Sequence, residues 1–329
     1  MSQRGCGLVW KCATAAMLVF HLAAQSGSWQ EARQTALQSR ASGRYLQAKQ
    51  QLTELLQQVR SREPGSLLVA QLLDDLGATE QDLGKPLEAE SLLTNALSIL
   101  KKAGETSGFQ MAMVKSHLGE LYLEQGRLPE AIGLFRQVLE MEQRAPQTDR
   151  ANLALAMSDL AMAYSFGGNL REAESLMHKS LGILEAELGP SHPLVATGLS
   201  HMAATLYRAK RYDEALPYAE RAWSILRQDP TVAEPDLLNT MGSLGLLYSL
   251  TGHSADAEYY AKTAAERAVT IYGREHLRTG WYTANYAAVL KNLNRKSEAK
   301  AVQKEANSML ATSARQNPGH QTLNASALR

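Results

Sequence analysis

The histidines are the side chains of this sequence best suited to bind a metal ion or to move a proton. The sequence contains a helical repeat, and His117 and His201 occupy the same position in two of its copies, with one copy between them. Stacked helices are separated by roughly 10 Å a layer, so two histidines in alternate repeats cannot share one metal ion. The chain also lacks a His-Glu-x-x-His, a Gly-x-Ser-x-Gly, a phosphate-binding loop and a zinc-spaced Cys/His set. The sequence therefore predicts no catalytic residue, no metal site and no cofactor.

Residues 1–26 have the layout of a secretory signal peptide. A mildly basic start precedes an apolar run over residues 12–24, and small residues follow at the positions of a cleavage site. The run is shorter than the roughly 20 residues that a membrane span requires. Cys6 and Cys12 both lie in this segment, so the mature chain is expected to have no thiol and no membrane span. We expect export to the periplasm or out of the cell, and an N-terminal membrane anchor is the alternative.

The charge of the chain argues against nucleic acid as a partner. Lys and Arg number 34, Asp and Glu number 33, and the formal net charge is +1. The basic residues are scattered and form no stripe with interleaved aromatic residues. Since 45% of the residues are hydrophobic and 20% are charged, the chain is expected to fold rather than to remain disordered.

An alanine preceded by an acidic or polar residue recurs seven times along the chain. The seven positions are Ala48, Ala89, Ala131, Ala173, Ala215, Ala257 and Ala299. The last six are evenly spaced, and the first interval is shorter by a single position. A fixed period of this length is the signature of a repeat architecture, in which stacked units complete one continuous core.

Two further positions show that each repeat is a helical hairpin. Five residues before the alanine stands a glycine or an asparagine that can end a helix in the left-handed conformation, and Lys210 is the one exception. Apolar residues three or four apart flank this turn on both sides, as amphipathic helices require. Twelve residues before the alanine, small residues allow two helices to approach closely: Gly77, Gly119, Ala161, Ala203, Gly245 and Ala287.

These positions resemble the tetratricopeptide repeat, and the 42-residue period is similar to the kinesin-light-chain subtype. The linker at residues 188–193, Leu-Gly-Pro-Ser-His-Pro, and the related segment 272–276 strengthen this resemblance. It implies an all-α, right-handed solenoid of about seven antiparallel helix pairs over residues 27–312. The polar segment 313–329 has no period, and we expect it to be a disordered tail.

The resemblance also implies where a ligand binds. In tetratricopeptide arrays the first helix of each pair lines a concave groove that holds extended peptides. The fourteenth, fifteenth and eighteenth positions before each repeat alanine should face this groove. They supply the candidate peptide-binding residues Ser116, His117, Ser158, Asp159, Ser200, His201, Asn239, Ser243, Trp281 and Asn285.

Two functions remain open on this evidence. The first is a monomeric, non-catalytic scaffold or adaptor that binds a peptide segment of a partner protein in the groove. The alternative is a structural or assembly component that self-associates through its ends or its convex face. The alternative is suggested by alanine and aromatic residues on the second helices, such as Tyr218, Trp223, Tyr259 and Tyr260.

Overall fold

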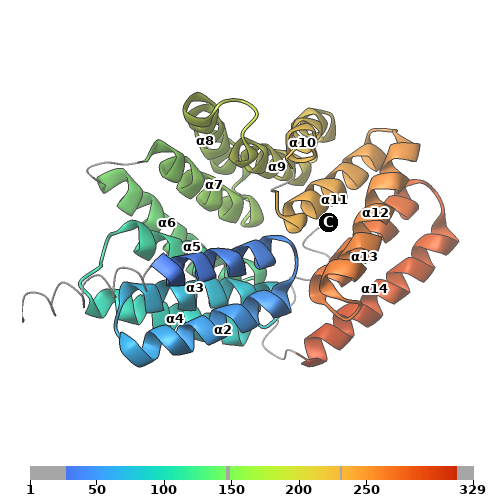
Figure 1. Cartoon of the computed structure of the whole chain (residues 1–329). Coiled ribbons are helices and arrows are strands. Elements are labelled where there is room, and N and C mark those ends of the chain that lie inside the picture. The colour runs from blue at the N-terminus through green and yellow to red at the C-terminus, as the bar shows by residue number, and fades with distance from the viewer. Residues whose placement is uncertain (1–26, 146–148, 230–231, 317–329) are drawn as a thin grey trace, which may run out of the picture.

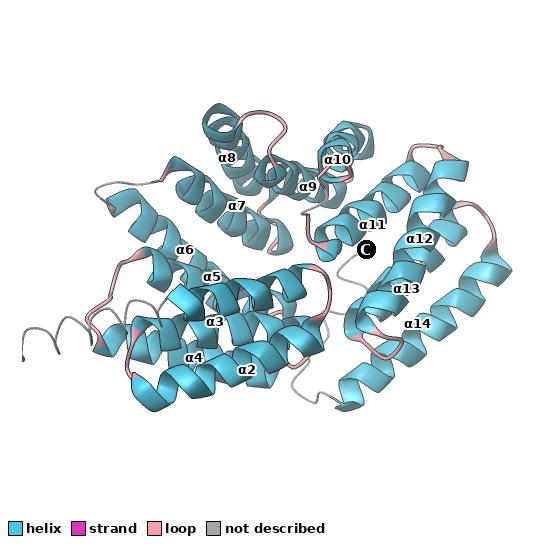
Figure 2. Ribbon diagram, in the orientation of Figure 1, coloured by secondary structure: helices cyan, strands magenta, loops and turns pink. Residues whose placement is uncertain are grey.

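The computed structural model describes residues 27–145, 149–229 and 232–316 of the chain. Every regular element in these ranges is a helix, and they contain no strand (Figures 1 and 2). The first helix spans residues 27–41. The following helices are α2 (Tyr45–Arg62), α3 (Leu67–Asp82), α4 (Pro86–Lys102), α5 (Phe109–Glu124), α6 (Leu128–Arg144), α7 (Arg150–Phe166), α8 (Leu170–Leu188), α9 (Pro193–Arg208), α10 (Tyr212–Leu226), α11 (Glu234–Leu250), α12 (Ser254–Tyr272), α13 (Leu277–Asn292) and α14 (Lys296–Gln316).

The helices form seven antiparallel hairpins, from the pair of helix 27–41 and α2 to the pair of α13 and α14. Consecutive hairpins stack because the first helix of each one also packs on the first helix of the next, as α11 does on α13. The array winds into a solenoid with the first helices on the inside and the second helices on the outside (Figure 1). The predicted all-α solenoid of seven helix pairs is thereby confirmed.

The close contact between the two helices of a hairpin explains the small residues in the sequence. All seven repeat alanines are buried, six of them with no exposed surface and Ala299 with 7%. A Cβ atom added to Gly119 would lie 2.7 Å from a ring carbon of Phe135, and one added to Gly245 would lie 2.8 Å from the backbone nitrogen of Ala261. Larger side chains at these positions would therefore push the helices apart.

Lys210 occupies the turn position that glycine or asparagine takes in the other hairpins, and it adopts the same left-handed conformation with φ 60°. Its N–H donates to the carbonyl of Tyr207, and the N–H of Arg211 donates to the carbonyl of Leu206. The equivalent bonds close the turn at Gly126. The backbone hydrogen bonds that end the helix therefore fix this conformation, whichever residue is present.

The two linkers that resemble the kinesin-light-chain signature have the same structure. Gly189 and Gly273 have φ values of 85° and 86°, and a histidine follows three residues later in each linker. The Nδ1 atoms of His192 and His276 accept a hydrogen bond from the backbone N–H two residues further on, so each histidine caps a helix. Their role is structural.

The solenoid completes one turn, so its last two hairpins meet its first three. Tyr45 stacks on Tyr272 with the ring centroids 5.8 Å apart. The guanidinium of Arg278 pairs with Asp82 at 3.0 Å and with Glu124 at 3.1 Å. Figure 1 shows the blue N-terminal helices beside the orange C-terminal helices, where the two ends of the array meet. We call this set of contacts the seam.

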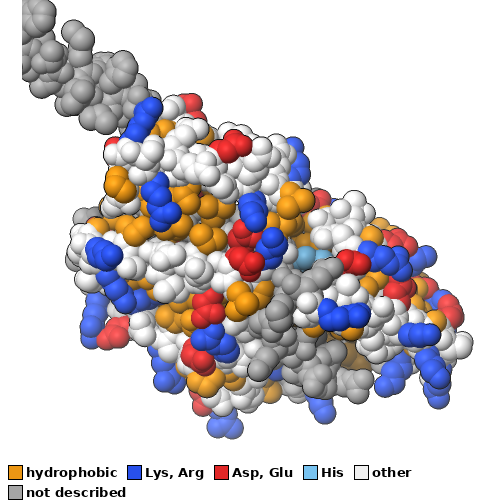
Figure 3. All heavy atoms as spheres, turned by 90° about the horizontal axis from the view of Figure 1, so that it is seen from below, with side chains coloured by type: hydrophobic (Ala, Val, Ile, Leu, Met, Phe, Trp, Pro, Cys, Tyr) orange, Lys and Arg blue, Asp and Glu red, His pale blue; other side chains and the backbone are white. Residues whose placement is uncertain are grey.

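The convex residues that suggested self-association lie mostly in the core. Trp223 and Tyr260 pack on each other edge to face, and both are only partly exposed. Tyr259 is the exception, with 62% of its surface exposed. Seen from below, the surface mixes acidic and basic side chains, and neither sign dominates this face (Figure 3).

The C-terminal helix extends further than the sequence indicated. α14 continues to Gln316, because Ser313 is 2% exposed and still packs in the helical array. The predicted tail therefore begins four residues too early, and residues 317–329 lie outside the described ranges. The predicted signal peptide, residues 1–26, also lies outside them.

Candidate functional site

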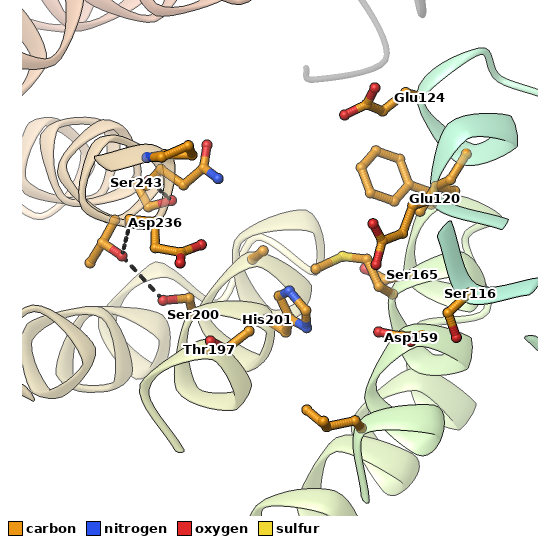
Figure 4. A pocket seen from close by; sticks show the side chains of 18 of the residues that line it. Ser116, Glu120, Glu124, Asp159, Ser165, Thr197, Ser200, His201, Asp236 and Ser243 are labelled. Carbon is orange, nitrogen blue, oxygen red and sulfur yellow. Dashed lines mark hydrogen bonds between the residues drawn. The ribbon is translucent and has the colours of Figure 1, made fainter. Parts of the chain in front are cut away.

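A cavity of about 1120 Å³ lies inside the ring on the concave surface. Its wall is formed mainly by the first helices of the hairpins, namely helix 27–41, α5, α7, α9, α11 and α13. Figure 4 shows side chains of α5 and α7 on one side of the cavity and side chains of α9 and α11 on the other. The seam completes the wall, since Arg40, Asp82 and Arg278 also line it.

Nine of the ten residues predicted for the groove line this cavity, and Ser158 does not. Ser158 is only 2% exposed, and its hydroxyl lies 2.8 Å from Nδ1 of His201, between two inner helices. The nine residues that line the cavity are Ser116, His117, Asp159, Ser200, His201, Asn239, Ser243, Trp281 and Asn285.

Hydrogen bonds between consecutive repeats explain the position of Ser158. The residue fourteen positions before one repeat alanine forms a hydrogen bond with the residue fifteen positions before the previous repeat alanine. His117 thus pairs with Asp74 at 2.7 Å, and His201 pairs with Ser158 at 2.8 Å. Polar groups that the sequence assigned to a ligand are therefore partly used to join the repeats.

His117 and His201 occupy equivalent positions, but they differ in charge. Burial lowers the pKa of His117, yet the carboxylate of Asp74 outweighs this effect and raises the pKa to about 9. Burial alone lowers the pKa of His201 to about 4, because its partner Ser158 is uncharged. At neutral pH the first histidine carries a proton on both nitrogens and the second is neutral.

Carboxyl groups project into the cavity from two neighbouring helices, Glu120 from α5 and Asp159 from α7 (Figure 4). Burial raises the pKa of Asp159 to about 8, and the charge of Glu120 adds to the shift. The pKa of Glu120 is also raised, because the surrounding ring of protein limits its solvation. The sequence predicts both residues for the groove, Asp159 fourteen and Glu120 eleven residues before their repeat alanines, and three residues correspond to about one turn along the same helix face.

Asparagine contributes little to a ladder that could hold a peptide backbone. Asn239 accepts a hydrogen bond from the hydroxyl of Tyr282 in the next repeat. Asn285 lines the cavity beside Gly242. Serine and threonine take the corresponding places elsewhere, and the hydroxyl of Ser200 lies 3.4 Å from that of Thr240. The cavity is polar along this wall without a repeated amide.

The described residues also bear on metal binding and on membrane insertion. These residues contain no group of three or more His, Cys, Asp or Glu side chains arranged to hold a metal ion. None of the described helices combines the length and the apolar character that crossing a membrane requires.

The sequence model of the tetratricopeptide repeat matches residues 110–186, 166–228 and 195–268. No curated protein matches the sequence. Among solved structures, BtubC (BKLC) from P. vanneervenii is similar, with 20% identity and a TM-score of 0.52 over 70% of this chain and 92% of that one.

Two further solved structures of similar fold contain a bound peptide or factor. The Rap conjugation gene regulator of plasmid pLS20, in complex with the Phr* peptide, is 14% identical with a TM-score of 0.67 over 88% of this chain and 75% of that one. A Rap protein complexed with Competence and Sporulation Factor is 13% identical with a TM-score of 0.63 over 88% and 79% of the two chains. At these identities the similarity is one of fold.

Proposed function

The chain is a tetratricopeptide repeat protein, and we propose that it is a non-catalytic scaffold that binds a peptide segment of a partner protein in its central cavity. The observation that carries this proposal is the convergence of polar side chains from six inner helices on one cavity of about 1120 Å³. Such a volume slightly exceeds the roughly 300–1000 Å³ of typical small-molecule pockets, so it suits a short stretch of polypeptide.

The composition of the wall supports a peptide rather than a rigid apolar ligand. Met113, Leu155 and Met162 alternate with Ser116 and Asp159 on α5 and α7. A peptide presents apolar side chains and backbone amides in turn, and flexible methionines adapt to such a surface. The solved structures of Rap proteins with bound Phr* peptide or Competence and Sporulation Factor, which share the fold, also support this use of it.

A capture experiment tests the proposal. The full chain is immobilised beside a variant in which three cavity residues are replaced, Asp159→Ala, His201→Ala and Asn239→Ala. A matched control carries three substitutions on exposed outer-helix residues, Glu88→Ala, Glu172→Ala and Asp213→Ala. We expect a partner that the parent and the control retain and the cavity variant loses. If all three chains, shown to be folded by circular dichroism, capture the same proteins, the cavity is not the binding site.

We further propose that the protein acts outside the cytoplasm and as a monomer. The layout of residues 1–26 supports export. N-terminal sequencing of the protein from the exported fraction tests this, and a mature chain starting near residue 27 is the expected result. Light scattering during size exclusion tests the second part, since an oligomer that grows with concentration would favour self-association.

A further inference from the structure

Glu120 and Asp159 form a pair of carboxyl groups that face the cavity, and neither has an ion-pair partner in the described part of the chain. Asp159 is half-buried and Glu120 is exposed to the space inside the cavity. Burial and the charge of Glu120 both raise the pKa of Asp159. A hydrogen bond from Ser116 lowers this pKa, but by less. Among the described residues no Lys, Arg or His side chain forms an ion pair with either carboxylate. Two carboxyl groups that are poorly hydrated favour a ligand that carries positive charge.

The nearest positive charges are already engaged. His117 lowers the pKa of both carboxyl groups, but its Nδ1 is bonded to Asp74 at 2.7 Å. Arg40 also lowers the pKa of Glu120, but its Nε donates to Asp82 at 2.7 Å. Acidic groups therefore outnumber the cations along this wall. The acids of the seam differ, since each of them contacts an arginine.

A second observation at this wall concerns a buried hydroxyl group. Ser165 lines the same cavity on α7 and has no exposed surface, and its hydroxyl has no hydrogen-bond partner in the described part of the chain (Figure 4). Buried hydroxyl groups nearly always have a partner, and leaving one without costs about 1–3 kcal/mol. A ligand that displaces the side chains covering Ser165 can supply this hydrogen bond.

We infer that the segment bound in the cavity carries a positively charged group, which Glu120 and Asp159 bind together while methionine and leucine side chains of the wall contact its apolar neighbours. The inference depends on the proposed peptide-binding function and specifies its ligand. The group is a primary ammonium or a guanidinium, and it comes from a lysine, an arginine or a free amino terminus. An acidic peptide is disfavoured, because its charge would oppose the negative charge on this pair of carboxyl groups.

Synthetic peptide pools test this with defined probes. Five heptapeptide pools are randomised at six positions. Four are acetylated at the amino terminus and fix lysine, arginine, norleucine or glutamate at the centre, and the fifth fixes norleucine and keeps a free amino terminus. The full-length chain is immobilised, and the retained fraction of each pool is measured by mass spectrometry. We expect at least one cationic pool to be retained about tenfold more than the acetylated norleucine pool, and the identity of that pool reveals the source of the charge.

Two double variants make the result specific. Glu120→Gln with Asp159→Asn removes both carboxylates with little change in shape, and retention of the cationic pool should then fall to that of the norleucine pool. Glu88→Gln with Glu172→Gln removes the same charge from exposed positions of α4 and α8, and retention should not change. Equal retention of all pools by the parent would overturn the inference and leave peptide binding intact. Preferred retention of the glutamate pool would do the same, and failure to retain any pool would contradict both.

Discussion

Nη1 of Arg278 lies 3.0 Å from Oδ1 of Asp82, although 196 residues separate them in the sequence. Asp82 also accepts a hydrogen bond from Nε of Arg40 at 2.7 Å, so one carboxylate joins the first, second and seventh hairpins. Only 8% of its side chain and 19% of that of Arg278 are exposed. The seam is therefore made of side chains that are shielded from solvent, and it encloses the cavity.

Replacing Arg278 should open the ring without unfolding the repeats. Arg278→Met removes the links to Asp82 and Glu124, while each hairpin keeps the packing on its neighbours that supplies most of the stability. We expect a larger radius of gyration in small-angle X-ray scattering and a loss of about 1–3 kcal/mol. Arg295→Met is the control, because its pairs with Glu258 and Glu298 are local. Identical scattering curves for the two variants would show that the seam does not hold the ring closed.

His117 should stabilise the fold in a pH-dependent way. Its pKa is about 9 in the folded chain and near 6.5 in the unfolded chain, so its contribution is complete below pH 6.5 and is lost as the pH rises through 9. We expect His117→Gln to cost on the order of 2–3 kcal/mol at pH 6 and much less at pH 9.5, measured by urea unfolding.

His201 should change the stability with pH in the opposite direction, and it serves as the control. Its folded pKa of about 4 lies below 6.5, so the folded state loses stability as the pH falls from 6.5 to 4. The cost of His201→Gln should therefore shrink as the pH is lowered over this range. Costs that do not vary with pH in either variant would contradict the assigned charge states.

Gly245 should tolerate no side chain. Its Cβ would lie 2.8 Å from the backbone nitrogen of Ala261 in α12, which cannot turn away, so Gly245→Ala should lower the free energy of unfolding by about 1–3 kcal/mol. Gly133 in α6 has open space around the same position, and Gly133→Ala should stabilise by about 0.5–1 kcal/mol because alanine is the better helix former. Thermal unfolding followed by circular dichroism compares the two, and effects of equal sign would disprove the helix contact.

Lys210 is the one non-glycine residue besides Asn294 with a positive φ in the described chain. A side chain in this conformation is strained by roughly 1 kcal/mol, and glycine avoids the strain at some cost in unfolded-state entropy. Lys210→Gly should therefore raise the free energy of unfolding by about 0.5 kcal/mol, and the midpoint of thermal unfolding should rise slightly with it. The same substitution at Lys262, within α12, should lower the midpoint. A lower midpoint in both variants would show that the turn imposes no strain on the lysine.

Binding of a cationic peptide should release a proton. The pKa of Asp159 is about 8 in the free protein, so below this pH the carboxyl group must lose its proton to bind the cation. The affinity of an acetylated lysine peptide selected from the pools should rise roughly tenfold from pH 6.5 to 8.5, over which lysine stays charged. Titration calorimetry measures both effects, and Asp159→Asn should abolish them. An affinity that falls over this range would be inconsistent with a role for Asp159.

The sequence predicted the repeat because the residues that define it act locally. Ala131 and Gly119 report the close approach of two helices within one hairpin, so their spacing alone reveals the period. Lys210 looked like an exception, but the backbone bonds of the turn fix its conformation whatever the side chain is.

The cavity was only partly predictable, since it depends on relations between repeats. Ser158 shares its column with residues that line the cavity, yet it is buried because His201 of the next repeat bonds to it. The seam between Asp82 and Arg278 was not foreseen. It results from the small rotation of each hairpin on the last, which accumulates over the whole array and leaves no mark in any single repeat.

The seam also sets the size of the array. In an open solenoid a duplicated or deleted repeat changes only the length, and each remaining unit keeps both neighbours. Here an eighth hairpin inserted before α13 would carry Arg278 past Asp82 by one unit, and the loss of a hairpin would leave it one unit short. Unlike an open array, this protein can neither gain nor lose a repeat between α3 and α13 without giving up its closure.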